Sequence, residues 1–403
     1  MTGYNILHYN DPVTLPDHTI ETNERRKSNR SKYKDIVCAF DIETTRLDDD
    51  NSIMYIWMFG IGKENVYIGR TWNELEYFIR NILDQIGENE KLVILVHNLS
   101  YEFCFLRTIY NFQPDEVYAL KSRKIAKCSM YGKLEFRCTY IHSNMSLDQY
   151  TKKMDVEHKK LSGEEYDYSI KRYPDTKMTE QEIKYCCHDV VGLIEAYEKE
   201  MQIDGDTLAT IPMTSTGYVR RECRNAMKLY SIQAIRESQP DPERYHIMRL
   251  AFRGGDTHAS RFYSTQILED VKSADRSSSY PDTMCNDLFP SGRGTWTGKV
   301  SNHVFNRFYH NDERCFFANV VFRNLRLKDK YWGFPYIPFG KCVKFSSDHL
   351  IDNGRVLSAS LIELYITNID FRIIEETYTF DLEVKQMLVF PAKKLPSPLV
   401  EIT

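Results

Sequence analysis

The sequence predicts an α/β fold, because strand-like apolar segments and a segment of helical periodicity alternate in its first third. Segments 36–45, 53–60, 66–69 and 91–96 are rich in β-branched and aromatic residues and have the length of strands. Between the third and the fourth of these segments, apolar residues recur at helical spacing: Trp72, Leu75, Phe78, Ile79, Ile82, Leu83 and Ile86. Strands and a helix in this order favour a mixed sheet with helices packed against it.

Composition bounds the class of protein. The chain has 403 residues, 42% of them hydrophobic and 27% charged, which is typical of a globular protein with two or more domains. Its purely apolar runs, such as 92–96, are far shorter than a membrane span, and residues 1–10 lack the pattern of a signal peptide. We therefore expect a cytoplasmic protein without a membrane partner. The ten cysteines include no C-x-x-C pair, so neither a zinc site nor a disulfide framework is predicted.

The net charge of −4 gives no global sign of a nucleic-acid partner. Basic residues nevertheless gather at 25–34, 121–127, 152–160 and 220–228. Each cluster alone is more typical of a solvated face than of a phosphate-binding track.

The strand predicted at 36–45 ends with two carboxylates, Asp41 and Glu43, which lie one residue apart. Side chains at i and i+2 of a strand point to the same face, so these two acids project together. Their mutual repulsion raises both pKa values unless a hard cation such as Mg²⁺ or Mn²⁺ neutralises them. Taken alone, such a pair is more typical of a strand that ends at the surface.

Later elements bring further polar groups. Residues 97–103 form a turn that opens a helix, 125–129 and 134–140 read as strands, and Ser146 opens another helix. A capping box at Thr179 and Glu182 starts a helix that runs to about residue 201 and ends near 204–206. Tyr185 and Asp189 are four residues apart on this helix, hence on one face. If that face turned toward the sheet, it would bring a third acid toward the first two.

These polar groups form three ordered motifs: Asp41-x-Glu43, Asn98-x-x-Tyr101-Glu102 and Tyr185-x-x-x-Asp189. Four carboxylates and a tyrosine suit two-metal phosphodiester hydrolysis, in which two ions about 3.5–4 Å apart clamp the attacking and leaving oxygens. The motifs resemble those of the DnaQ-like 3′-to-5′ exonucleases, which have a ribonuclease-H-like fold.

The resemblance implies roles for single residues. One Mg²⁺ or Mn²⁺ ion would be bound by Asp41, Glu43 and Asp189. Asp41 would also bind the second ion. The hydroxyl of Tyr185 would orient the attacking water. Thr44, Asn98 and Tyr101 would bind the single-stranded 3′ end of DNA. The second motif usually has Asp where this chain has Glu102, whose extra methylene moves the carboxylate by roughly 1.5 Å. A ligand that acts through water can absorb that difference.

Two landmarks follow in the second half of the chain. Residues 252–255 read Phe-Arg-Gly-Gly, in which Gly254 and Gly255 allow close approach of a ligand and Arg253 can meet a phosphate. Residues 271–281 place Asp275 at the end of a predicted strand, followed by a serine-rich turn and Tyr280-Pro281.

The segment Asp275-x-x-Ser278-x-Tyr280-Pro281 resembles motif A of family B DNA polymerases, although Ser279 stands where that motif usually has Leu. The Arg-Gly-Gly element is similar to the DNA-binding linker between their exonuclease and polymerase domains. The order of the motifs is that of the protein-primed branch in phages and linear plasmids, and Ser146-Leu147 matches its single-strand-binding pair. The resemblance implies that Asp275 binds the polymerase metals, two ions per active site, and that Ser278 and Tyr280 contact the nucleotide.

We therefore expect four regions: an irregular lead-in (1–34), a ribonuclease-H-like exonuclease domain (35–204), a linker with the start of the polymerase palm (205–290), and a β-rich insertion (291–403). Strand-like runs at 315–321 and 361–366 support the last region, which would contact the terminal protein that primes synthesis. That assignment rests on position in the chain.

The sequence after Asp275 contains no D-x-D motif and no N-S-x-Y-G helix, and one aspartate serves two-metal nucleotidyl transfer poorly. Our hypothesis is an N-terminal portion of a DNA-directed DNA polymerase in viral or plasmid replication, split or truncated, in the cytoplasm of the host cell. Its partners would be primer–template DNA, deoxynucleotides, the terminal protein and a second polypeptide. A freestanding 3′-to-5′ exonuclease and a non-catalytic module that binds DNA or terminal protein are the alternatives.

Overall fold

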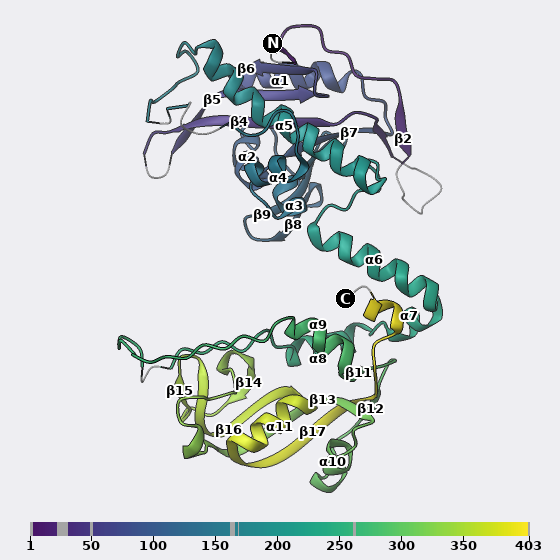
Figure 1. Ribbon diagram of the computed structural model, residues 1–403, viewed down its shortest axis with the longest axis vertical. Coiled ribbons are helices and arrows are strands. Elements are labelled where there is room, and N and C mark those ends of the chain that lie inside the picture. Colours follow the sequence, from purple (N-terminus) through teal and green to yellow (C-terminus); the bar gives the residue numbers. More distant parts are fainter. Residues whose placement is uncertain are drawn as a thin grey trace. The chain divides into compact units, whose positions relative to one another are not determined.

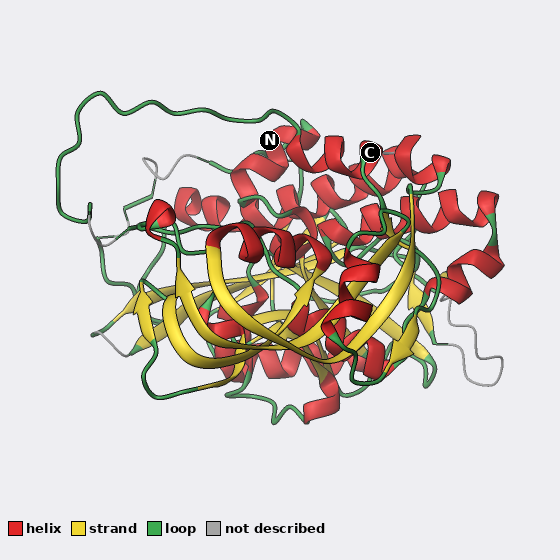
Figure 2. Ribbon diagram, turned by 90° about the horizontal axis from the view of Figure 1, so that it is seen from below, coloured by secondary structure: helices red, strands yellow, loops and turns green. Residues whose placement is uncertain are grey.

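The computed structural model describes residues 3–21, 31–48, 51–161, 166–167, 169–260 and 263–401. The chain divides into two compact units, Met1–Arg220 and Arg221–Thr403, so the division falls later than the boundary expected at 204/205. Figure 2, coloured by secondary structure, shows strands and helices mixed throughout, as the α/β prediction requires. No helix in the described ranges is long and apolar enough to cross a membrane.

The first unit is built on a ten-stranded sheet with the order β1-β6-β5-β4-β7-β10-β9-β8, and β3 pairs with both β7 and β2 (Figure 1). Its strands are β1 (Asn5–His8), β2 (Thr19–Glu21), β3 (Lys32–Lys34), β4 (Cys38–Arg46), β5 (Ser52–Ile61), β6 (Asn65–Gly69), β7 (Glu90–Val96), β8 (Val117–Lys121), β9 (Lys124–Met130) and β10 (Leu134–Cys138). Its helices are α1 (Trp72–Leu83), α2 (Leu99–Leu106), the 3₁₀ turn η1 (Pro114–Glu116), α3 (Thr139–Ser143), α4 (Leu147–Met154) and α5 (Glu180–Asp204). Helix α6 (Ser215–Tyr230) continues into the second unit.

Most predicted elements are confirmed, with three differences in this unit. The lead-in 1–34 was expected to be irregular, yet it contributes β1, β2 and β3, which are too short to leave a periodic pattern. The strand expected over 134–140 ends at Cys138, where α3 begins. Strand β8 was not predicted. Of the basic cluster at 25–34, residues 25–30 lie outside the described residues.

Strand alternation decides which face of the sheet carries the acids. Val37 and Ala39 of the β4 segment belong to the core that α4 and α5 cover, whereas Phe40 and Ile42 belong to the core that α1 and α2 cover. Asp41 and Glu43 continue the odd-numbered series and therefore lie on the α5 face.

Strand register brings the second motif to the same edge. β7 runs parallel to β4, with Ala39 opposite Leu95, so the end of β7 lies level with Phe40 and Asp41. Helix α2 starts at Leu99, directly after this strand. Its first turn is therefore close to the carboxylates of β4.

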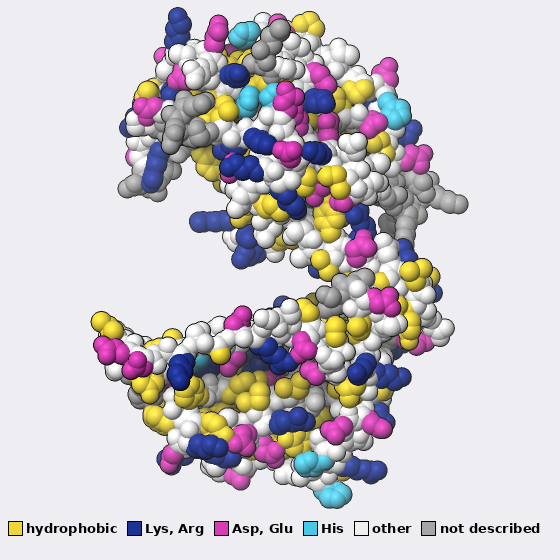
Figure 3. Space-filling model, in the orientation of Figure 1, with side chains coloured by type: hydrophobic (Ala, Val, Ile, Leu, Met, Phe, Trp, Pro, Cys, Tyr) yellow, Lys and Arg dark blue, Asp and Glu magenta, His cyan; other side chains and the backbone are white. Residues whose placement is uncertain are grey.

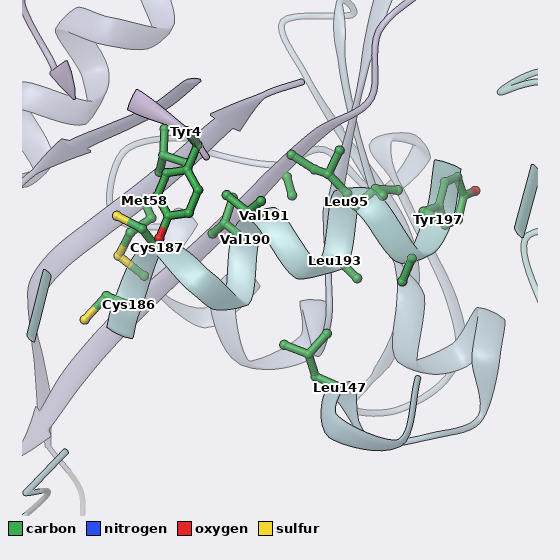
Figure 4. Packing of buried hydrophobic residues seen from close by; sticks show 14 of the residues in the cluster. Tyr4, Met58, Leu95, Leu147, Cys186, Cys187, Val190, Val191, Leu193 and Tyr197 are labelled. Atoms are coloured by element: carbon green, nitrogen blue, oxygen red, sulfur yellow. The ribbon is translucent and has the colours of Figure 1, made fainter. Parts of the chain in front are cut away.

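Helix α5 packs very closely on its neighbours, and two glycines permit this. A Cβ atom at Gly60 of β5 would lie 2.7 Å from side-chain carbons of both Val190 and Ile194 on α5. A Cβ atom at Gly192 would lie 2.2 Å from the backbone oxygen of His158. Figure 4 shows Val190, Val191 and Leu193 of α5 in the apolar core that also contains Tyr4, Met58, Leu95 and Leu147. This packing fixes the position of the whole helix.

The second unit contains an antiparallel sheet with the order β11-β17-β13-β16-β14, in which β12 also pairs with β17 and β15 with β16. Its strands are β11 (Phe289–Pro290), β12 (Thr295–Thr297), β13 (Arg314–Leu327), β14 (Cys342–Phe345), β15 (Leu350–Asp352), β16 (Arg355–Thr367) and β17 (Tyr378–Lys393). The helices are α7 (Ile232–Ser238), α8 (Pro242–Ala251), α9 (Ser279–Asn286), α10 (Asn302–Tyr309), α11 (Asn368–Thr377), α12 (Ser397–Glu401) and the 3₁₀ turns η3 (Asp329–Tyr331) and η4 (Phe339–Lys341). The predicted strand runs at 315–321 and 361–366 lie within β13 and β16.

The close packing of α5 predicts that Gly192→Ala destabilises the protein. Alanine gains about 1 kcal/mol of helix propensity over glycine, but the contact with a backbone oxygen forces a shift that costs about 1–3 kcal/mol or more. We expect a lower free energy of unfolding in urea. Gly298→Ala is the control, because nothing lies within 4 Å of a Cβ there. Equal stability of both variants and the parent would contradict this account.

Candidate active site

Four carboxylates from three elements form one electrostatic cluster. Asp41 and Glu43 come from β4, Glu102 from α2 and Asp189 from α5. Glu102 and Asp189 are only 5% and 7% exposed, and Asp41 and Glu43 are partly buried. The predicted convergence of the three motifs is therefore present in the structure.

Burial and mutual repulsion raise the pKa values of these acids. Burial first, and then the charge of Asp189, raise the pKa of Asp41 to about 7. Burial and the charges of Asp41 and Asp189 raise the pKa of Glu43 to about 8. Burial, followed by the charge of Asp41, raises the pKa of Glu102 well above its usual range. Without a cation, the cluster therefore holds protons at neutral pH.

Lys160 supplies one positive charge to the cluster. Its Nζ lies 2.5 Å from Oδ2 of Asp189, and its charge lowers the pKa values of Asp41, Glu43 and Asp189. Burial lowers the pKa of Lys160 itself, but Asp189 and Asp41 raise it by more, so the ammonium group stays charged. The single positive charge of this lysine does not neutralise the negative charge of four carboxylates.

The remaining oxygens fit a divalent cation. Glu102 Oε2 and Asp189 Oδ1 are buried and accept no hydrogen bond from the described residues. Buried carboxylate oxygens without partners are costly in a folded protein, and oxygen-rich sites are those that Mg²⁺ and Mn²⁺ prefer. The donor chemistry thus agrees with the metal site expected from the sequence. Among the described residues, the group whose ligand atoms already lie within 4.8 Å of one another is a different one, Glu157, His158 and Glu195, so the four acids would have to draw together around an ion.

Tyr185 lies one turn before Asp189 on α5. It is buried, and its ring stacks on Tyr166 with 4.7 Å between the centroids. Its hydroxyl contributes to the raised pKa of Lys160, which places it in the same electrostatic environment.

The predicted strand-binding residues gather beside the acids. Thr44 Oγ1 and the Tyr101 hydroxyl share a hydrogen bond of 2.5 Å, which ties β4 to α2, and Tyr101 is 40% exposed. A cavity of about 590 Å³ brings together Asn98, Ser146, Leu147 and Lys160. Ser146 also has a structural role, because its hydroxyl accepts the Gln149 N–H and caps α4.

Sequence reasoning missed two residues of this site, Lys160 and His97. Lys160 appeared only as the end of a basic run, and no motif distinguished it from its neighbours. His97 lines the same cavity, and burial lowers its pKa to about 4, so the ring is neutral. The signal for His97 was its position directly after the buried strand 91–96, next to Asn98.

In the second unit, the Arg-Gly-Gly element and the following turn lie near one another. A Cβ at Gly255 would lie 3.5 Å from the Tyr280 hydroxyl, and Gly254, Gly255 and Tyr280 are exposed. Arg253 instead points inward: its Nε lies 3.1 Å from Asp370 Oδ1 and its guanidinium 5.1 Å from the Tyr336 ring centre. A phosphate contact by Arg253 would require separation from Asp370.

The strand expected before Asp275 is absent from the described structure. Residues 271–276 are irregular and exposed, and no described strand pairs with them, so they lack the hydrogen bonds that hold a strand. Ser278 has a left-handed backbone (φ +52°) and precedes α9, whose first residues include Tyr280. Asp275 is exposed, and no group of metal ligands in the described ranges contains it.

Comparison with known families agrees with the motif analysis. Residues 115–397, more than half of the chain, match the family model of DNA polymerase type B, organellar and viral. The chain belongs to this family. The match begins after the first two exonuclease motifs, so it does not bear on Asp41, Glu43 or Glu102.

Individual relatives point to phage polymerases. The chain is 24% identical over 364 residues to the DNA polymerases of Bacillus phages B103, Nf and M2. These matches cover 85% of this chain, which spans 58% of the relatives' length.

Solved structures share the fold. The chain resembles the phage Phi29 DNA polymerase bound to single-stranded DNA, with a TM-score of 0.66 and 15% identity. Its ternary complex with primer–template DNA and incoming nucleotide gives a TM-score of 0.63 and 16% identity. Each match covers 91% of this chain and 62% of the other. The predicted fold class is thereby confirmed, and the family match with the phage relatives confirms the predicted resemblance to family B polymerases of phages.

The raised pKa values predict that the metal-free protein loses stability as pH rises. Between about pH 4.5 and 8, folded Asp41 and Glu43 hold protons that the unfolded chain has lost, so the free energy of unfolding falls with pH. The fall is at most about 1.4 kcal/mol per pH unit for each group. Urea denaturation in chelator should show a shallower fall for Asp41→Asn/Glu43→Gln. An identical pH dependence in that variant would contradict the assigned pKa shifts.

Proposed function

We propose that the first unit is a 3′-to-5′ exonuclease acting on single-stranded DNA ends, and that the chain forms part of a protein-primed DNA polymerase. The observation that carries the proposal is the buried cluster of Asp41, Glu43, Glu102 and Asp189, with two oxygens that lack partners. Membership of the type B polymerase family supports the second part.

The four carboxylates would hold two Mg²⁺ or Mn²⁺ ions, with Asp41 shared between them. Bound ions of this kind activate the attacking water and stabilise the leaving oxygen of a phosphodiester. The contribution of the chain is to fix the ligands: β4 and the first turn of α2 hold three of them, and α5 brings the fourth. Glu102 takes the position at which the resembled family has Asp, and its longer side chain suits a ligand that acts through water.

Other groups of the site have positioning roles in this proposal. The hydroxyl of Tyr185 orients the attacking water. Lys160 lowers the pKa of Asp189, which burial raises, and places a positive charge beside the cavity that would receive the scissile phosphate. Thr44 and Tyr101 hold the terminal nucleotide, and a base stacks on the exposed tyrosine ring. Asn98, Ser146 and Leu147 contact the preceding nucleotides along the same cavity.

The second unit would serve polymerisation. Asp275 would bind the polymerase metals, Ser278 and Tyr280 the incoming deoxynucleotide, and the segment with Arg253, Gly254 and Gly255 the primer–template DNA. Residues 291–403 would contact the terminal protein. Because the sequence after Asp275 contains no D-x-D motif, we propose that a second polypeptide supplies the second metal-binding acid, in the cytoplasm of a phage- or plasmid-bearing host.

A freestanding exonuclease is the second candidate, and the irregular, exposed segment around Asp275 favours it. Under that function the second unit would only bind DNA. The two candidates share the site in the first unit and differ in whether any added polypeptide enables primer extension.

A primer assay tests the proposed function. We expect the chain with Mg²⁺ to shorten a 5′-labelled primer from its 3′ end, and Asp41→Ala/Glu43→Ala to abolish shortening by at least about 10³-fold, because both metal positions lose ligands. The variant should fold, since it removes repelling charges. Shortening by the variant at the parent rate would refute the exonuclease assignment, and primer extension by this chain alone would refute the need for a second polypeptide.

A further inference from the structure

A second basic feature lies on the hairpin of β8 and β9, outside the acidic cluster. Lys121, Arg123 and Lys124 surround its turn, all three are exposed, and none forms an ion pair with the described residues. Lys and Arg side chains gather in Figure 3 over the region where Figure 1 labels β8 and β9. The residues of the turn therefore concentrate positive charge at one edge of the sheet.

The charge arrangement is unfavourable in the isolated protein. Lys121 and Lys124 are direct cross-strand partners, and like charges in opposed positions repel. Arg123 between them adopts a left-handed backbone with φ +58°, which is costly for a residue with a side chain. An anionic partner would relieve this repulsion.

Exposed apolar side chains accompany the charges. Tyr118 and Leu120 of β8 are 53% and 49% exposed, and Tyr131, just after β9, is 43% exposed. β8 is the last strand of the sheet on this side. Tyr118 lies three residues before Lys121, whereas Tyr131 lies at the other end of β9 and packs on Tyr110 with 4.7 Å between the ring centroids. Cations and exposed aromatic rings along one hairpin suit a flexible polyanion whose bases can stack, which is the character of single-stranded nucleic acid.

The hairpin is joined to the helix that carries the second exonuclease motif. The backbone N–H of Ile125 on β9 donates a 3.0 Å hydrogen bond to the Ser100 hydroxyl on α2. Ser100 directly precedes Tyr101, and Glu102 follows. A DNA strand that leaves the proposed exonuclease site past Tyr101 therefore approaches the hairpin.

We propose that the β8–β9 hairpin is a second binding site for single-stranded DNA, which holds the part of the strand that lies 5′ of the nucleotides in the exonuclease site. The inference rests on the proposed exonuclease function and extends it to substrate length. The bases stack on Tyr118 and Tyr131, and the phosphates lie along Lys121, Arg123 and Lys124. The hairpin does not increase the affinity for a substrate that is too short to reach it.

The test compares a long and a minimal substrate in Mg²⁺, with Lys121→Ala/Arg123→Ala/Lys124→Ala as the variant. For a single strand of about 20 nucleotides we expect KM to rise about tenfold at low salt and its salt dependence to weaken. Hydrolysis of the p-nitrophenyl ester of thymidine 5′-monophosphate should not change, because this substrate does not reach the hairpin. The control Lys32→Ala/Lys63→Ala/Lys177→Ala removes the same charge from other exposed positions and should behave like the parent.

The outcomes separate this inference from the proposed function. An unchanged KM and salt dependence for the long strand would overturn the hairpin site while leaving the exonuclease intact. An equal rise in the control would show a general charge effect and would also overturn it. Parent protein that cleaves neither substrate would refute the exonuclease, and with it the inference. Tyr118→Ala/Tyr131→Ala, at unchanged charge, should raise KM for the long strand alone.

Discussion

The repulsion between four buried or partly buried carboxylates is the constraint on which the first unit depends. Burial and mutual charge raise the pKa values of Asp41, Glu43 and Glu102, and Lys160 offsets only part of the negative charge. A fold that keeps such a cluster sacrifices stability in the absence of a cation. The cost is intelligible if divalent ions occupy the cluster during function, because hard cations turn the repulsion into ligation.

The rest of the scaffold holds these acids together. Strand alternation on β4 turns two of them toward α5, and the parallel register with β7 brings α2 to the same edge. Gly60 and Gly192 let α5 approach until Asp189 joins the cluster. The loop residue His158, whose backbone Gly192 contacts, lies two positions before Lys160. One close helix contact therefore positions both the fourth acid and the compensating cation.

The sequence could predict the parts of this site that local rules govern. The period-2 pattern placed Asp41 and Glu43 on one face, and the Thr179 capping box located α5. It could not predict Lys160, whose role arises only from tertiary packing, or the inward turn of Arg253 toward Asp370. The prediction of a strand before Asp275 was wrong, because a strand requires a pairing partner, which the residue pattern alone does not supply.

The most direct test of the central claim is Mn²⁺ binding followed by electron paramagnetic resonance, with Asp41→Ala/Glu43→Ala as the comparison. The account predicts that the parent binds two more Mn²⁺ ions per chain than the variant, and that these two are spin-coupled, as for ions about 3.5–4 Å apart. Equal binding by the two proteins, or additional ions without coupling, would contradict a two-metal centre at the carboxylate cluster.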